Sequence, residues 1–295
     1  MNNKTNIYYV ESPGQIISAI EAIYLYKNNN AKLFVRLNGE KYNDEQIKQT
    51  ILFYQQKVKI KFEVHFINNL LKFIFTFVLT CRKSKGKKFV GCHKSKYIKL
   101  MSYFTDIKDH YLLDDGIATL IYQDKGGHGP LFTCLDIKGK PRQEVVRHNF
   151  NCLKSIPTKE KVGAPIFFGA KYVEAGIISL NSYVEILKGL INTKGNLIYV
   201  AHRAEKDENL EIYKSLGVSI VRFRLPSEIE LLLRKDKPKE IYGIYSASLI
   251  TSKIINPKMK VFYIRPSSLL IDKEVEDLIY SNMKQYNISE LEING

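Results

Sequence analysis

The sequence contains no tryptophan and only four cysteines among its 295 residues. Cys81, Cys92, Cys134 and Cys152 are widely spaced and form no CxxC pair or Cys/His cluster along the chain. This spacing argues against a structural zinc site and against a disulfide framework. We therefore expect four reduced thiols and no structural metal.

Long apolar runs are also missing. The most apolar stretch, residues 70–80, is too short to cross a bilayer and contains Lys72, so it predicts a buried or interfacial helix. The first residues do not combine a basic start, an apolar stretch and a small-residue cleavage site, so we expect no signal peptide and a cytoplasmic protein. A composition of 45% hydrophobic and 25% charged residues is typical of a soluble globular protein.

Acidic residues are in the minority, and the formal net charge is +15. The excess is concentrated in residues 82–99, which contain no acid and eight bases, Arg82, Lys83, Lys85, Lys87, Lys88, Lys94, Lys96 and Lys99. Such a run attracts phosphate groups of nucleic acid, an anionic membrane surface or a nucleotide-linked substrate, although it could equally be a solvated face. No recognised nucleic-acid motif accompanies it, so we expect no nucleic acid among the partners.

The length favours two domains of roughly 130 to 150 residues each. Short apolar runs alternate with helical periodicity, which predicts an α/β fold with parallel sheets and crossover helices. The predicted strands are residues 6–10, 33–37, 58–64, 89–91 and 111–113, then 197–200, 218–222, 241–245 and 261–264. Residues 136–162 are polar with little periodicity and predict a linker between domains 1–150 and 151–295. Two such domains predict a ligand cleft between the carboxyl ends of their sheets.

The tripeptide Asp114-Asp115-Gly116 directly follows the predicted strand 111–113. Paired carboxylates at the end of a buried strand are costly unless they have a function, and the glycine allows a sharp turn. The functional interpretation is a proton acceptor. The structural alternative is a helix N-cap, in which Asp binds free backbone amides.

Further polar side chains follow the predicted strands of the second half. His202 and Arg203 come after residues 197–200, Glu228 after 218–222, and Ser246 with Ser248 after 241–245. Together they could bind a phosphate and a ribose diol. Taken singly, each has a structural alternative, because a lone His is often only hydrogen-bonded, Pro-x-Glu often opens a helix, and Ser often caps one.

In their order, these motifs resemble the bacterial sialyltransferases and the related polysialyltransferases over roughly residues 6–270. The resemblance rests on Val10-Glu11-Ser12-Pro13-Gly14-Gln15, Asp114-Asp115-Gly116, His202, Pro226-x-Glu228 and Ser246-x-Ser248. It implies a GT-B fold of two Rossmann-like domains, the first on the acceptor side and the second binding the donor. It also implies CMP-sialic acid as donor, a surface glycan as acceptor, and no metal or other cofactor.

The resemblance also implies roles for single residues. Asp115, the second acid of its motif, corresponds to the general base, and His202 to the histidine that contacts the CMP phosphate. Glu228 corresponds to the ribose-binding glutamate, and Ser246, with Ser248, to the phosphate-binding hydroxyl pair. Two departures concern the phosphate site, because Arg203 stands where the family has proline and Ala247 interrupts the hydroxyl pair.

The chemistry of transfer fits these roles. The departing CMP phosphate gains charge as the sugar becomes oxocarbenium-like, so cationic or hydrogen-bonding groups such as Arg203 belong beside it. The acceptor hydroxyl attacks in one displacement, which inverts the anomeric centre, while Asp115 takes its proton. The alternatives are transfer of pseudaminic acid or Kdo, a non-catalytic glycan-binding protein, or a nucleic-acid-binding protein. A lipid-linked acceptor would place the enzyme peripherally on the inner face of the bacterial membrane, attracted through residues 82–99.

Overall fold

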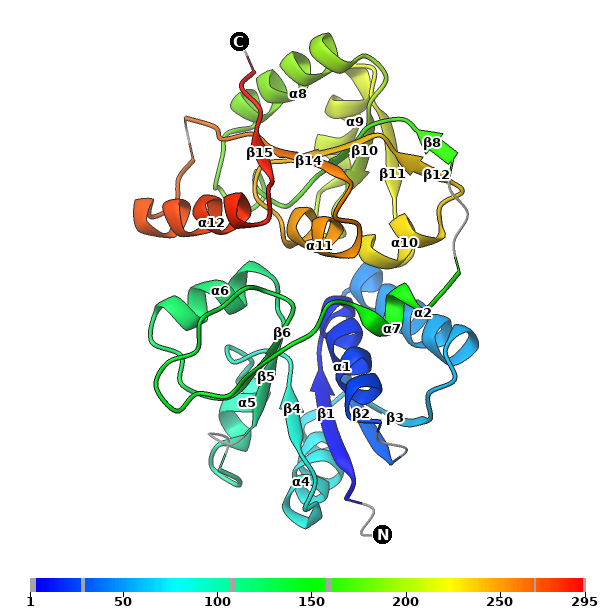
Figure 1. Ribbon diagram of the computed structural model, residues 1–295, viewed down its shortest axis with the longest axis vertical. Helices are drawn as coiled ribbons and strands as arrows, with labels where there is room; N and C mark the ends of the chain where they lie inside the picture. The colour runs from blue at the N-terminus through cyan, green and yellow to red at the C-terminus, as the bar shows by residue number, and fades with distance from the viewer. Residues whose placement is uncertain (1–3, 28–29, 107–109, 158–160, 268, 294–295) are drawn as a thin grey trace. The chain divides into compact units, whose positions relative to one another are not determined.

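The computed structural model describes residues 4–27, 30–106, 110–157, 161–267 and 269–293. The chain divides into two compact units, Met1–Ile156 and Pro157–Gly295 (Figure 1). Each unit is built on a parallel sheet, as the alternation of strands and helices predicts. Among the described residues, none of the helices has both the length and the apolar character needed to span a bilayer.

Unit 1 contains a seven-stranded sheet in the order β3-β2-β1-β4-β5-β6-β7, and all its strand pairs are parallel. The strands are β1 (Asn6–Val10), β2 (Ala31–Arg36), β3 (Phe62–Ile67), β4 (Lys88–Val90), β5 (Tyr111–Leu113), β6 (Leu131–Thr133) and β7 (Val145–Arg147). The chain first winds from β1 toward β3, then returns past β1 to continue from β4 to β7. The sheet therefore has a topological switch point between β1 and β4, where ligands bind in such sheets.

The helices of unit 1 follow the strands in sequence. They are α1 (Pro13–Leu25), α2 (Lys41–Lys57), α3 (Leu70–Lys72), the π-helix η1 (Phe73–Val78), α4 (Leu79–Lys83), α5 (Lys96–Met101), α6 (Ile117–Asp124) and α7 (Asn151–Lys154). Ser12 caps α1 by accepting a hydrogen bond from the Gln15 amide at 3.4 Å, and Pro13 occupies the first turn, as the sequence predicts.

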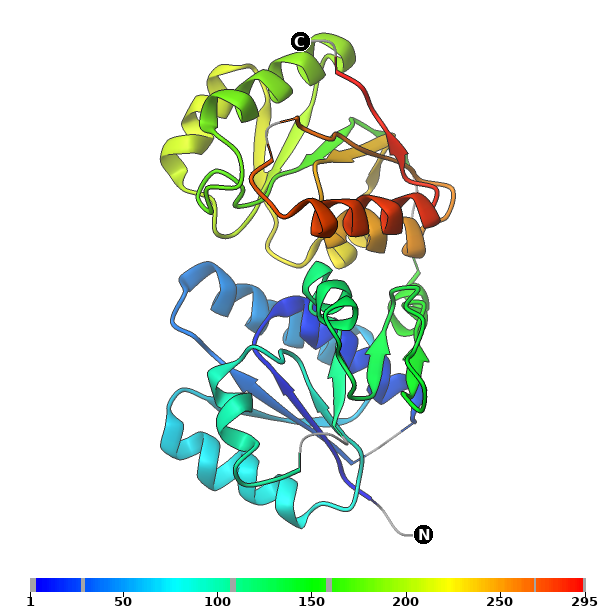
Figure 2. The same cartoon turned by 90° about the vertical axis from the view of Figure 1, so that its left-hand side faces the viewer.

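The core of unit 1 explains why β1 is apolar after its first residue, Asn6. All five of its residues are buried, since the central strand of a parallel sheet is covered on both faces. On one face, Ile7 and Tyr9 belong to the same buried cluster as Phe73 and Phe77 of η1. On the other face, Tyr8 stacks on Phe89 of β4 with ring centroids 4.6 Å apart. Figure 2 shows helices on both sides of this sheet.

Unit 2 contains a six-stranded parallel sheet in the order β11-β10-β9-β13-β14-β15, and a two-stranded sheet of β8 with β12. The strands are β8 (Lys161–Gly163), β9 (Ile166–Phe168), β10 (Ile198–Ala201), β11 (Ser219–Arg222), β12 (Asp236–Pro238), β13 (Glu240–Gly243), β14 (Lys260–Tyr263) and β15 (Ser289–Glu290). The helices are α8 (Leu180–Lys194), α9 (Asp207–Ser215), α10 (Ser227–Leu233), α11 (Ala247–Ile255) and α12 (Lys273–Gln285). Its switch point lies between β9 and β13.

The predicted linker 136–162 is wrong in most of its extent, because this segment contains β7 and α7 of unit 1. The buried carboxylate of Glu21 on α1 accepts hydrogen bonds from the amides of Cys152 and Leu153 at 3.0 and 2.9 Å. These bonds cap the short helix α7 and hold it against α1. The boundary between the units therefore lies after Ile156.

Six strands of the described residues were not predicted, and one was misplaced; the missed strands are β6, β7, β8, β9, β12 and β15. β6, β7 and β9 have three residues each, too few to show a period of two. The strand predicted at residues 58–64 is β3, which begins only at Phe62. α2 extends to Lys57, and Phe62 is the first residue of β3, where it pairs with Ala31 at the start of β2. Residues 58–61 therefore connect α2 to β3.

Candidate functional site

Asp114 and Asp115 lie at the carboxyl edge of the unit 1 sheet, immediately after β5. Gly116 follows with φ +62° and ψ −137°, a conformation that favours glycine, so the chain turns sharply as predicted. Gly116 itself is the N-cap of α6, and no side chain caps that helix. The N-cap alternative for the two aspartates is therefore wrong.

The carboxylate of Asp115 is held by a buried glutamine. Gln15 Nε2 donates to Asp115 Oδ1 at 2.8 Å, while Gln15 Oε1 accepts from the backbone amide of Glu11 at 2.8 Å. Because both ends of the Gln15 amide are bonded, its donor is aimed at Asp115. The Asp115 amide in turn donates to Thr119 Oγ1 at 2.8 Å, which fixes the backbone at the same point.

Gly91, just after β4, makes room for this glutamine. A Cβ atom on residue 91 would lie 2.1 Å from Gln15 Oε1, far inside contact distance. Cys92 follows, and its thiol bonds to Asp115; burial first, and then the Asp115 charge, raise the pKa of the thiol to about 11. The thiol is therefore protonated at neutral pH and can donate to the carboxylate.

Asp114 has different surroundings. Its Oδ1 accepts from the Thr133 hydroxyl, and its Oδ2 accepts from the Cys134 amide at 2.5 Å. His148 Nε2 lies 3.3 Å from the same Oδ2. Asp114 therefore fastens the ends of β6 and β7 to the end of β5, while Asp115 binds α1. The two carboxylates do not share a site, contrary to the expectation of a carboxylate pair.

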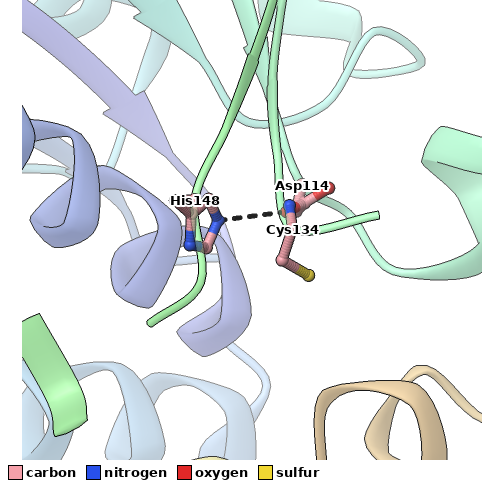
Figure 3. A group of neighbouring side chains, drawn as sticks. All are labelled: Asp114, Cys134 and His148. Atoms are coloured by element: carbon pink, nitrogen blue, oxygen red, sulfur yellow. Dashed lines mark hydrogen bonds and ion pairs between the residues drawn. The ribbon is translucent and has the colours of Figure 1, made fainter. Parts of the chain in front are cut away.

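One group of described residues offers three kinds of metal ligand. Ligand atoms of Asp114, Cys134 and His148 all lie within 4.8 Å of one another, and Figure 3 shows the three side chains together. The wide spacing of the cysteines in the sequence hid this group. Both Asp114 oxygens already accept hydrogen bonds from Thr133 and Cys134, so a metal ion would compete with bonds that the fold itself supplies. That no metal is needed stays a prediction.

A further polar network adjoins Gln15 at the switch point. Glu11 follows β1, and its carboxylate accepts from the Tyr9 hydroxyl at 2.8 Å and pairs with Arg36 of β2 at 3.2 Å. The guanidinium of Arg36 also lies 4.3 Å from the centroid of the Tyr97 ring. Anchoring Glu11 fixes the backbone amide that orients Gln15, so the segment Glu11-Ser12-Pro13-Gly14-Gln15 works as a support for Asp115.

In unit 2, His202 lies at the carboxyl edge of the sheet, directly after β10. Its Nδ1 accepts a hydrogen bond from the Ala204 amide at 3.1 Å. An accepting Nδ1 carries no proton, so the neutral ring bears its hydrogen on Nε2. Burial, and then the nearby charges of Arg203 and Lys171, lower the pKa of His202 to about 4. At neutral pH this side chain is an uncharged Nε2 donor among cations.

Glu205 fixes the loop that carries His202. Its buried carboxylate accepts from the His202 amide at 2.6 Å and from the Tyr199 hydroxyl. Arg222 of β11 donates to the carbonyls of His202 and Glu205 at 3.1 and 3.0 Å. A Cβ on Gly169, at the end of β9, would lie 2.6 Å from Glu205 Oε2. Burial raises the pKa of Glu205 to about 7.

The structure brings Glu228 and Ser248 into one cluster. Thr251 donates to Glu228 Oε1 at 2.8 Å, and the Ser227 hydroxyl lies 3.2 Å from Glu228 Oε2 and 2.8 Å from the Ser248 hydroxyl. Ser246 is the N-cap of α11 and accepts from the Ser248 amide at 3.2 Å. The Ser246 side chain therefore caps a helix, which is the structural alternative given for it from the sequence.

Several residues that shape these sites were not singled out from the sequence. Gln15 was only part of a motif, and Glu205 only followed His202. Lys171, Arg222 and His148 were not considered, because each reaches its position through strands that are distant in the sequence. A glycine directly after a strand, as at residues 91 and 169, is the one local signal that a side chain from elsewhere approaches the backbone there.

Comparisons with known proteins give a fold and no family. No protein-family model matches the sequence. No curated protein matches it either. The solved structures that resemble the chain include a Listeria monocytogenes protein described as a UDP-N-acetylglucosamine 2-epimerase. It is 10% identical with a TM-score of 0.53, and the match covers 98% of this chain and 92% of that one.

Two glycosyltransferases show weaker likeness. A glycosyltransferase from Rickettsia africae is 11% identical with a TM-score of 0.49, covering 92% of this chain and 81% of that one. MurG from Acinetobacter baumannii is 10% identical with a TM-score of 0.45, covering 97% and 85%. The predicted fold class, α/β of the GT-B type with two Rossmann-like units on parallel sheets, is confirmed.

Proposed function

We propose that the protein is an inverting, metal-independent sialyltransferase that moves sialic acid from CMP-sialic acid to a hydroxyl of a bacterial surface glycan, in lipooligosaccharide or capsule. The observation that carries the proposal is the support of Asp115, a strand-end carboxylate oriented by the buried side chain of Gln15. Such pre-orientation is what a general base requires.

In this proposal Asp115 accepts the proton of the attacking hydroxyl. Its Oδ1 accepts a hydrogen bond from Gln15 Nε2, and this bond orients the carboxylate. Asp114 cannot take this role without breaking its bonds to Thr133 and Cys134, which join the ends of β5 and β6. The structure thus supports the choice of the second acid of the motif.

His202 binds the donor phosphate in the same proposal. Its Nε2 hydrogen is available because Nδ1 is occupied by the Ala204 amide. A neutral donor can hydrogen-bond to the phosphate as negative charge develops there. Lys171 and Arg203 are close enough to lower the pKa of His202, and the same field favours an anion beside it. Arg203, in the place of the family's proline, thereby adds a cation.

Glu228, Ser246 and Ser248 remain the proposed contacts to ribose and phosphate. Ser246 precedes α11, a nine-residue helix whose first amides supply further donors for a phosphate. Glu228 would exchange its bonds with Ser227 and Thr251 for the ribose hydroxyls. This exchange keeps both carboxylate oxygens of the half-buried Glu228 bonded in both states.

The test is Asp115→Asn. The Asn oxygen still accepts from Gln15, so the fold and CMP affinity should be retained, while transfer falls by about 10²- to 10⁴-fold because no proton acceptor is left. We would measure CMP binding by titration calorimetry, and CMP release from CMP-linked sialic acid, pseudaminic acid and Kdo with glycan acceptors. The last comparison decides among the alternative donors.

Asp114→Asn is the matched control. It replaces the neighbouring carboxylate, so its main expected effect is lower stability through weaker bonds to Thr133, Cys134 and His148. Near-normal transfer by Asp115→Asn, with loss of transfer in a folded Asp114→Asn protein, would show that Asp114 is the base and that the assignment to Asp115 is wrong.

We further propose that the enzyme acts peripherally on the inner face of the cytoplasmic membrane, where a lipid-linked acceptor would lie.

A further inference from the structure

The segment from Leu70 to Lys83, formed by α3, η1 and α4, has two apolar faces. One face is buried: Phe73, Phe77 and Cys81 are at most 1% exposed and belong to the unit 1 core. The other face is open, with Leu71 67%, Phe75 66% and Leu79 38% exposed. We call these three residues, four positions apart, the apolar row. Core packing needs only the first face, so the second is unexplained by the fold.

Helix α5 extends this open surface. It packs beside η1, with the Tyr97 ring edge-on to Phe73 at 4.9 Å, and Ile98 joins the same core cluster. Beyond its C-terminus, Tyr103 is 84% and Phe104 44% exposed. Aromatic side chains of this kind are enriched where proteins meet the interface of a bilayer.

The charge around the apolar row has one sign. Residues 64–105 contain no Asp or Glu and nine Lys or Arg, namely Lys72 and the eight bases of 82–99. The eight do not form one patch, because Lys87 reaches the Tyr111 hydroxyl and Glu144, and Lys88 is half-buried in β4. The exposed ones are Arg82, Lys83, Lys85, Lys94, Lys96 and Lys99.

These bases lie at both ends of the apolar row. The helical segment 70–83 connects the carboxyl end of β3 to the amino end of β4. Arg82, Lys83 and Lys85 therefore come near the amino edge of the sheet, and Lys94 and Lys96, which follow β4, near its carboxyl edge. An apolar strip with cations at both ends matches the interface of an anionic bilayer, whose acyl boundary lies beneath phosphate groups.

We infer that this surface docks on an anionic membrane, with the apolar row entering the headgroup region and the flanking bases contacting lipid phosphates. The inference rests on the proposed peripheral location, and not on the donor or the acceptor. A second copy of this chain is disfavoured as the occupant, because the like charges of two such surfaces would repel. Nucleic acid would satisfy the bases and leave the apolar row exposed to water.

The experiment is sedimentation with vesicles of phosphatidylcholine alone or mixed with phosphatidylglycerol. The variant is Leu71→Gln/Phe75→Gln on the apolar row, and the matched control is Tyr42→Gln/Leu52→Gln on α2, whose two residues are each 46% exposed. We expect the wild type to bind only vesicles with phosphatidylglycerol, and the apolar-row variant to bind them at least about tenfold more weakly. The α2 control should bind as the wild type does.

The charge is tested by Arg82→Gln/Lys83→Gln/Lys85→Gln, which should bind more weakly and with less dependence on salt. Equal recovery with neutral vesicles, or unchanged binding by the apolar-row variant, overturns the inference. A wild-type dimer that becomes monomeric in that variant would assign the surface to a second copy and also overturn it. Transfer of sugar to a soluble acceptor is measured on the same proteins. If only the proposed function is wrong, transfer is absent while vesicle binding is as expected.

Discussion

Two groups of unit 2, the buried Glu205 and the half-buried His202, should give opposing contributions to the pH dependence of stability. The pKa of Glu205 is raised from 4.5 to about 7 by burial, and that of His202 is lowered from 6.5 to about 4 by burial and neighbouring cations. At about 1.4 kcal/mol for each pKa unit, each difference corresponds to about 3 kcal/mol of unfolding free energy.

The signs follow from which state holds the proton. Between pH 4.5 and 7 the folded protein keeps a proton on Glu205 that the unfolded chain has lost, so this contribution to stability disappears as the pH rises. Between pH 4 and 6.5 the unfolded chain holds a proton on His202 that the folded protein rejects, so stability is lost as the pH falls. Over their common range the two slopes cancel.

Single variants should expose each slope. The unfolding free energy of Glu205→Gln, minus that of the wild type, should rise by about 3 kcal/mol from pH 4.5 to 7. For His202→Gln the difference should fall by about 3 kcal/mol from pH 4 to 6.5. Urea unfolding followed by circular dichroism at a series of pH values measures both, and subtraction removes the titration of all other groups. If the difference in unfolding free energy between variant and wild type does not change with pH, or changes in the opposite direction, the reasoning is refuted.

Two further predictions concern the surroundings of Asp114 and Asp115. Gly91→Ala puts a methyl group 2.1 Å from Gln15 Oε1 and should displace that side chain, lowering the free energy of unfolding in urea by about 1–3 kcal/mol. Gly14→Ala, whose Cβ meets nothing within 4 Å, is its control, and equal stability of the two variants would contradict the role of Gly91. Transfer activity should persist in excess EDTA, measured as CMP release; loss that magnesium or manganese restores would instead favour a metal held near Asp114.

The sequence was sufficient for the α/β class because the strands β1, β5, β10 and β13 are largely apolar runs followed by polar residues. It was insufficient for β6 and β7, whose three residues carry no readable period. The same limit applies to the site. The position of Asp115 after a strand is a local property and was predicted, whereas its bond to Gln15 joins residues 100 positions apart.

The different surroundings of the two aspartates show the same limit. Adjacent residues in a sequence invite a joint interpretation, but Asp114 turns to β6 and β7 while Asp115 turns to α1. Only the strand order decides this, because β6 and β1 lie on opposite sides of β5 in the sheet. Residue chemistry thus indicated which groups matter, and topology determined their partners.

The capping of α7 by Glu21 determines where the chain can be cut. A fragment that ends at residue 150, the boundary suggested by composition, would remove the two amides that the buried Glu21 carboxylate binds. It would also remove Cys152 and Leu153, both fully buried. A fragment that extends through Ile156 keeps both bonds and both side chains. Studies of the isolated N-terminal unit, including its binding to membranes, should therefore use the longer fragment.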